Sequence, residues 1–113
     1  MHYVNEHDLA FRGGASGVKY FFRGPQIDWG VVVFAPGERL GHHFHERVEE
    51  TFYFVEGQGG TMVVNGQERP IRIGDAFRLE SGETHDIINN TAAPLKAIFI
   101  KSTYDPKDKV DVK

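Results

Sequence analysis

The 113-residue chain contains no cysteine. Disulfide bonds, thiolate metal sites, iron–sulfur clusters and thiol nucleophiles are therefore excluded. Long apolar runs are also missing: stretches such as residues 31–35 are far shorter than the roughly 20 residues of a membrane-spanning helix. The first residues lack the charged and apolar regions of a signal peptide. Together these absences predict a soluble, cytoplasmic protein without a membrane partner.

Blocks of like charge are absent too. The 13 Lys and Arg residues and 16 Asp and Glu residues are mixed along the chain, with a formal net charge of −3. Nucleic-acid-binding proteins carry a basic face or a run of Lys and Arg. The charge pattern therefore argues against a nucleic-acid partner.

Aromatic and turn-forming residues, in contrast, are plentiful. Nine Phe, four Tyr, one Trp and 13 Gly favour strands separated by tight turns over packed helices. Short apolar runs predict nine strands, at residues 18–22, 29–34, 40–45, 50–55, 60–64, 69–73, 76–79, 85–88 and 95–100. Asn65 and Gly66 between two of these runs are typical of a two-residue hairpin, because both central residues need a positive φ. The pattern indicates an antiparallel sandwich or barrel.

The two ends of the chain carry weaker signals. Residues 5–11 fit either one helical turn or a strand that pairs with a partner subunit, and residues 12–17 form a glycine-rich connector. Residues 104–113 alternate Asp and Lys with few apolar residues, which indicates a tail that is mobile or lies against a partner subunit. We expect one domain over the whole chain, with a core at about 18–102 and peripheral segments at 1–17 and 104–113.

A His-Phe-His triplet on the third predicted strand presents two imidazoles to one face. Residues two apart on a strand point the same way, so His43 and His45 project together and His42 points away. Two imidazoles at this separation can reach one metal ion. Taken alone, such a pair is more often a surface or hydrogen-bonded pair, and His2 and His7 carry no comparable pattern.

A carboxylate and a third imidazole fit the same interior. Glu50 shares its strand face with Phe52 and Phe54, where an ionised carboxylate is costly to bury unless something pairs with it. A metal ion would be such a partner, and His85 aims a third imidazole from a later strand. A solvated strand-end position for Glu50 stays an alternative. The competing carboxylates nearby are Glu46 and Glu49.

Together these residues resemble the two motifs of the cupin superfamily, in order and at the family's spacings. The first motif is matched by Gly37, His43-Phe44-His45, Glu50 and Gly57, and the second by Gly74, Gly82, His85 and Asn89. One position departs: Glu80 stands where the family has proline. Either Glu80 lies at the barrel mouth or it is an exposed charge, and Asn89 serves either a group behind the site or a turn.

The resemblance implies an all-β fold, a six- to eight-stranded cupin jelly-roll barrel. It also implies one divalent transition metal (Mn, Fe, Ni, Co, Cu or Zn) held by His43, His45, Glu50 and His85. Four protein ligands on an ion that accepts about five or six leave positions open for water, dioxygen or a chelating ligand. The predicted walls are apolar and no Arg or Lys cluster joins the motifs, which argues against a sugar phosphate. The wall residues are Phe34, Phe52, Phe54, Ile87 and Phe99.

The fold alone does not select a reaction. The leading hypothesis is a metal-dependent oxygenase or related lyase acting on a small organic acid, enol or phenol, with Glu50 also a candidate catalytic base. The alternatives are a non-catalytic module that binds or senses a small ligand, a metal-dependent isomerase, and a metal-bound protein without turnover. Open sheet edges further predict a homodimer, in which residues from about 1 to 25 help pair the sheets.

Overall fold

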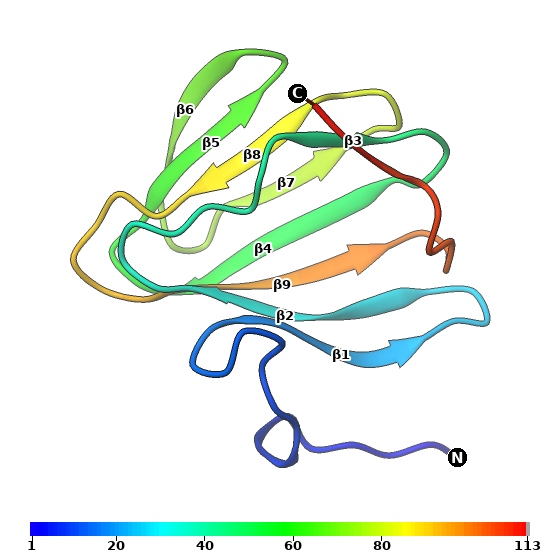
Figure 1. The fold of residues 1–113 in the computed structure, drawn as a ribbon. Helices are drawn as coiled ribbons and strands as arrows, with labels where there is room; N and C mark the ends of the chain where they lie inside the picture. The colour runs from blue at the N-terminus through cyan, green and yellow to red at the C-terminus, as the bar shows by residue number, and fades with distance from the viewer. Residues whose placement is uncertain (113) are drawn as a thin grey trace.

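The structure, a computed structural model, describes residues 1–112, and within them ten strands form two five-stranded antiparallel sheets (Figure 1). A short 3-10 helix, η1 (Glu6–Asp8), precedes them. The strands are β1 (Gly17–Arg23), β2 (Asp28–Phe34), β3 (His43–His45), β4 (Glu50–Glu56), β5 (Gly60–Val64), β6 (Gln67–Ile71), β7 (Ala76–Leu79), β8 (His85–Ile88), β9 (Leu95–Lys101) and β10 (Lys109–Asp111). All nine strands predicted from the sequence are present, within a few residues of their expected bounds, and β10 is additional.

The strand order shows a jelly-roll barrel. One sheet runs β1-β2-β9-β4-β7 and the other β10-β3-β8-β5-β6. From β2 onward the chain crosses between the sheets after every strand except at the β5–β6 hairpin, so that distant segments such as β2 and β9 become neighbours. The predicted fold class, an all-β jelly-roll barrel, is confirmed.

Alternation of apolar residues explains why these segments form strands around a common core. On β4, Phe52 and Phe54 are buried whereas Tyr53 between them is 45% exposed. On β9, Ala97 and Phe99 are buried in the same alternating way. Burial of each large side chain contributes roughly 1.5–3 kcal/mol. The core consists of Val32, Phe34, Phe52, Phe54, Met62, Ile71, Leu79, Ile87, Leu95, Ala97 and Phe99.

The predicted hairpin turn is also present. Asn65 and Gly66 adopt φ values of 50° and 80°, and the pair Val64 and Gln67 closes the β5–β6 ladder beside them. An asparagine and a glycine are needed here because other residues are strained in this left-handed region.

The N-terminal segment folds against the outside of the barrel. Asn5 caps η1 by accepting a hydrogen bond from the His7 backbone N–H, so the helical turn expected within residues 5–11 is present at Glu6–Asp8. Glu6 fastens the segment, because its carboxylate lies 2.6 Å from Lys96 Nζ and its backbone oxygen accepts from Lys19 Nζ. In the part of the chain that the structure describes, no helix is long and apolar enough to cross a membrane.

Of the two alternatives for the C-terminal tail, mobile or lying against a partner subunit, the first is wrong for residues 104–112. Lys109–Asp111 form β10, which pairs with β3, and Asp108 is fully buried. Val110 is the one apolar residue in this strand, so the sequence carries no alternating apolar signal there. Backbone hydrogen bonds and buried polar contacts hold the segment instead. Lys113 lies outside the described residues.

Candidate metal centre

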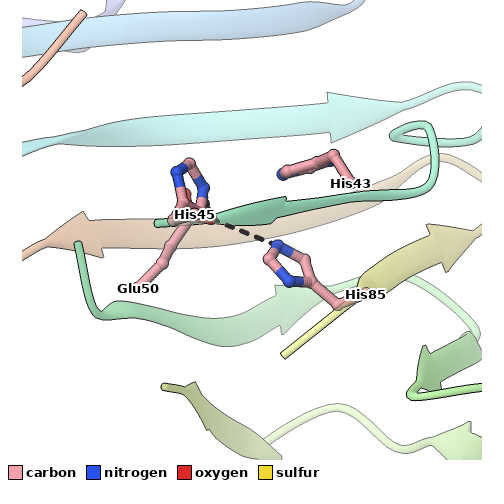
Figure 2. Close-up of side chains that lie close together, drawn as sticks. All are labelled: His43, His45, Glu50 and His85. Carbon is pink, nitrogen blue, oxygen red and sulfur yellow. Dashed lines mark hydrogen bonds and ion pairs between the residues drawn. The ribbon is translucent and has the colours of Figure 1, made fainter. Parts of the chain in front are cut away.

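The four predicted ligands lie together inside the barrel (Figure 2). His43 and His45 come from β3, Glu50 begins β4, and His85 begins β8. One potential ligand atom from each residue lies within 4.8 Å of the corresponding atoms of the other three. All four side chains are buried, and His42 is outside the cluster. The strand alternation that predicted the two imidazoles on one face therefore does bring them to a common point.

Backbone carbonyls orient two of the three imidazoles. His43 Nδ1 lies 2.7 Å from the Gly41 carbonyl oxygen, and His85 Nδ1 lies 3.2 Å from the Glu83 carbonyl oxygen. A carbonyl oxygen can only accept a hydrogen bond, so Nδ1 carries the hydrogen in each ring. The Nε2 lone pair of a neutral ring is then free on the side that faces the cluster.

Within residues 1–112, the Nε2 lone pair of His85 has no donor to accept from. His85 Nε2 is buried without a hydrogen-bond partner among the described residues and lies 3.5 Å from Glu50 Oε1. Buried polar atoms are nearly always paired in native structures. A divalent cation between the Nε2 atoms and the carboxylate would satisfy this atom, and the three-imidazole, one-carboxylate donor set suits a first-row transition metal. The residues present therefore fit a metal ion.

The protonation states also suit a metal site. Burial raises the pKa of the Glu50 carboxyl, but the neighbouring rings of His45 and His85, together with the charge of Lys101, outweigh burial and lower the pKa to about 2. Burial and the neighbouring His85 lower the pKa of His43 to about 4. Near neutral pH the centre thus offers an ionised carboxylate and a neutral imidazole at His43, which are the forms that bind metals.

A cavity of about 110 Å³ opens beside the cluster, and its lining includes cations that the sequence analysis did not expect. Arg12, Lys101 and Lys109 line it together with Val18, Tyr20, Val32, Leu40, Phe52 and Phe99. The expectation that no basic cluster joins the motifs is wrong, because the topology gathers these cations from the glycine-rich connector, the end of β9 and the start of β10. Of the five predicted wall residues, Phe52 and Phe99 line the cavity, and the other three belong to the core behind it.

Lys101 is the cation best placed to act in this cavity. It stands opposite Glu50 in the pairing of the neighbouring strands β9 and β4, and its ammonium donates a 3.2 Å hydrogen bond to the Tyr20 hydroxyl. No carboxylate among the described residues lies within ion-pair distance of its Nζ. A sequence signal for Lys101 did exist, since it follows the buried Phe99 by two residues and so shares its inward face.

The loops of the second motif show the roles of Asn89 and Glu80, for which the sequence left two alternatives each. Asn89 is fully buried, and its amide donates 2.8 Å hydrogen bonds to the carbonyls of Phe34 and Ala93, so it has the turn role. Glu80 is an exposed charge. The Glu83 carboxylate accepts a 2.8 Å hydrogen bond from the Glu80 backbone N–H, and this bond holds the loop before His85 where the family has proline.

Comparisons with known proteins agree with this architecture. Residues 30–101, more than half of the chain, match the cupin domain family. Over 67 residues the chain is 39% identical to an oxalate-binding protein of Thermotoga maritima, covering 58% of this chain and 54% of that protein. Over 71 residues it is 30% identical to quercetin 2,3-dioxygenase of Bacillus subtilis, covering 62% of this chain and 21% of that enzyme. The chain thus spans about half, or less, of the length of these relatives.

A solved structure extends the likeness to the whole barrel. The crystal structure of a conserved protein with a double-stranded β-helix domain from Klebsiella pneumoniae superposes with a TM-score of 0.84 over 100% of this chain and 98% of that chain. At 14% identity this likeness shows the fold alone. The family match and the strand topology together establish that the chain belongs to the cupin family.

Proposed function

We propose that the chain binds one divalent transition metal through His43, His45, Glu50 and His85 and acts there on a small organic acid, as an oxygenase or related lyase. The observation that carries the proposal is the buried four-donor cluster beside a small cavity with a cationic lining. A metal at this position would supply Lewis-acid chemistry or dioxygen activation. Mn, Fe, Ni, Co, Cu and Zn all accept imidazole and carboxylate donors.

The charge of the cavity favours an acid over a neutral enol or phenol. Three cations line the cavity among the described residues, against the single carboxylate of Glu50. If Glu50 binds the metal, the ammonium of Lys101 is left to attract an anion from the substrate. Charged hydrogen bonds between cations and carboxylates are about twice as strong as neutral ones.

The size of the cavity limits the substrate further. At about 110 Å³ it is much smaller than the roughly 300–1,000 Å³ of pockets that hold drug-sized ligands. Size, rather than the lack of cations inferred from the sequence, is therefore the argument against a sugar phosphate. The names of two relatives, an oxalate-binding protein and a quercetin dioxygenase, support an oxygen-donor ligand.

The residues around the ligands have separable roles in this proposal. Phe52 and Phe99 keep bulk water away from one side of the cavity, and Lys101 with Tyr20 binds and orients the acid. A pKa of about 2 makes Glu50 a weak base, since a general base works best with a pKa near the operating pH. The role of Glu50 as a ligand is thus better supported than its role as a catalytic base.

A second candidate function is a binding module without turnover, which the name of the oxalate-binding relative favours.

The test is to load the protein with Mn, Fe, Ni or Zn and to incubate it with small mono- and dicarboxylates such as oxalate, in air and under strict anaerobiosis. An oxygenase requires both metal and dioxygen, whereas a lyase needs the metal alone. A binding module raises its melting temperature with the acid and does not consume it. If the metal-loaded protein shows no turnover of any acid and no rise in melting temperature with any acid, the proposal is contradicted.

A further inference from the structure

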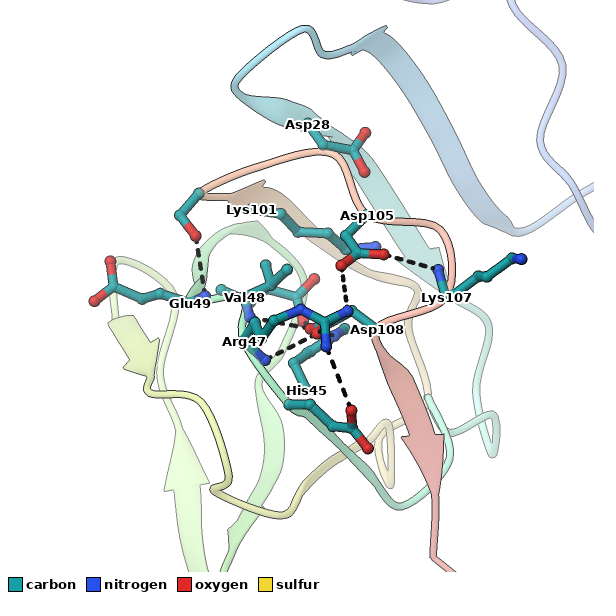
Figure 3. A network of polar contacts seen from close by, with 12 residues as sticks. Asp28, His45, Arg47, Val48, Glu49, Lys101, Asp105, Lys107 and Asp108 are labelled. Carbon is teal, nitrogen blue, oxygen red and sulfur yellow. Dashed lines mark hydrogen bonds and ion pairs between the residues drawn. The ribbon is translucent and has the colours of Figure 1, made fainter.

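The C-terminal strand lies against the strand that carries two of the proposed ligands. Figure 3 shows the polar side chains gathered around Asp108, just before this strand. In the antiparallel pairing of β10 with β3, Lys109 stands opposite His45 and Asp111 opposite His43. On its other side β3 pairs with β8 through the residue pair His43 and His85 within the described chain. Much of the hydrogen bonding that fixes this three-residue strand therefore comes from β10.

Asp108, just before β10, is a fully buried carboxylate with several partners. Its Oδ1 accepts a 2.8 Å hydrogen bond from the Arg47 backbone N–H, and its Oδ2 accepts a 3.0 Å hydrogen bond from the Val48 backbone N–H. Its backbone oxygen accepts from the Glu46 N–H at 3.2 Å. These bonds fasten residues 46–48, the connection from the two histidines of β3 to Glu50.

The same carboxylate faces the back of a proposed ligand. Asp108 Oδ2 lies 3.5 Å from His45 Nδ1, while His45 Nε2 on the opposite side of the ring lies 3.1 Å from Glu50 Oε1. A neutral imidazole carries one N–H, and the nitrogen that keeps it cannot bind a metal. Nε2 can therefore serve as a ligand only if the N–H of the ring is on Nδ1 and faces Asp108, rather than on Nε2 and facing Glu50.

We propose that Asp108 is a positioning residue for the metal centre: it keeps the His45 hydrogen on Nδ1 and aims Nε2 at the metal, so that the C-terminal segment completes the site. The inference rests on the metal binding in the proposed function. His43 and His85 each face a backbone carbonyl at Nδ1, and the Asp108 carboxylate, 3.5 Å from His45 Nδ1, lies in the corresponding place behind His45. Partners of this kind fix the tautomer and ring orientation of metal-bound histidines, and their loss lowers metal affinity about 10–100-fold.

The test compares Asp108→Asn with wild type in zinc affinity, measured by competition with a chromophoric chelator. We expect the variant to bind zinc about 10–100-fold more weakly. The matched control is Asp111→Asn, on the adjoining strand β10: the Asp111 side chain is 74% exposed, and the variant should leave the affinity unchanged. Equal affinities for wild type and a folded Asp108→Asn would overturn the role of Asp108, whereas failure of the wild type to bind zinc would overturn the metal centre as well.

A second measurement avoids the variant and so does not depend on its folding. In zinc-loaded wild-type protein, nitrogen-15 chemical shifts of the histidine rings report which nitrogen carries hydrogen. We expect His45 to be protonated at Nδ1 with zinc on Nε2. A His45 ring with an unprotonated Nδ1 would contradict the proposal, even if zinc binds with high affinity.

Discussion

At the scale of single residues, Lys101 is a cation on the inward face of a strand next to a buried carboxylate. Its ammonium lies near two aromatic rings, with Nζ 5.4 Å from the Tyr20 ring centroid and 5.8 Å from that of Phe99. Its charge helps to keep Glu50 ionised. Because a metal would neutralise Glu50 in turn, the positive charge of Lys101 then becomes available to an incoming anion.

The first prediction concerns this charge. Lys101→Met should weaken the binding of a small carboxylate such as oxalate to the metal-loaded protein by roughly 10- to 100-fold, since a hydrogen bond to a charged group is worth about 1.5–3 kcal/mol. Titration calorimetry measures the affinity. The control, Lys107→Met, removes an exposed cation outside the cavity and should have no effect. Equal affinities in the two variants would remove Lys101 from the binding site.

The second prediction concerns the pH dependence of stability in the metal-free protein. His43 has a pKa of about 4 in the folded protein and near 6.5 in the unfolded chain. Between these values the unfolded chain binds more protons, so the free energy of unfolding should fall as the pH drops from 6.5 to 4, by on the order of 3 kcal/mol. Glu50, with its pKa lowered from 4.5 to about 2, extends the loss below pH 4.5.

Urea unfolding at a series of pH values between 7.5 and 4.5 tests this prediction. The slope that belongs to His43 should disappear in His43→Gln and persist in His2→Gln, which changes an exposed histidine of the N-terminal segment. If wild type and His43→Gln lose stability equally between pH 6.5 and 4.5, His43 is not held neutral in the folded protein.

At the scale of elements, sequence patterns within a single strand predicted the position of that strand and the direction of its side chains. Alternating aromatic residues located β4 and β9, and the two-residue spacing of His43 and His45 placed both imidazoles inside. The same reasoning missed β10, because Val110 gives it no apolar alternation. It also missed the cationic lining, since Arg12 and Lys109 reach the cavity through strand pairings between segments that are distant in the sequence.

The third prediction concerns the packing of β1 on β2. A Cβ added to Gly30 of β2 would lie 1.9 Å from the Lys19 carbonyl oxygen of β1, so the strands must move apart. Gly30→Ala should lower the free energy of unfolding by about 1–3 kcal/mol or more. Gly37→Ala is the control, since its Cβ meets nothing within 4 Å and its positive φ costs only about 1 kcal/mol. Equal losses in urea unfolding would show that β1 yields without strain.

At the scale of the whole molecule, both sheets end in edge strands that pair with one neighbouring strand among the described residues. β1 forms one edge of its sheet, and β6 and β10 form the edges of the other. Exposed apolar side chains also gather on the outer face of the first sheet, where Tyr53 and Ile100 are 45% and 41% exposed. Open edges and apolar faces are commonly covered by a second subunit.

The fourth prediction is therefore a homodimer in which residues from about 1 to 25 help pair the sheets. Multi-angle light scattering at micromolar concentration should give about twice the chain mass of 12.8 kDa. A mass close to that of one chain across this range would contradict the prediction, and would leave the metal centre unaffected because all four proposed ligands come from one chain.

Every role proposed for the site depends on a bound metal, which elemental analysis of protein purified without chelators and without a histidine tag detects directly. We predict about one divalent transition metal per chain, as expected for a three-histidine, one-carboxylate site. His43→Ala, His45→Ala and His85→Ala should each lose most of it, while His42→Ala, whose ring lies outside the cluster, should keep it. Protein without bound metal that also takes up none on reconstitution, or an equal loss in His42→Ala, would contradict the account.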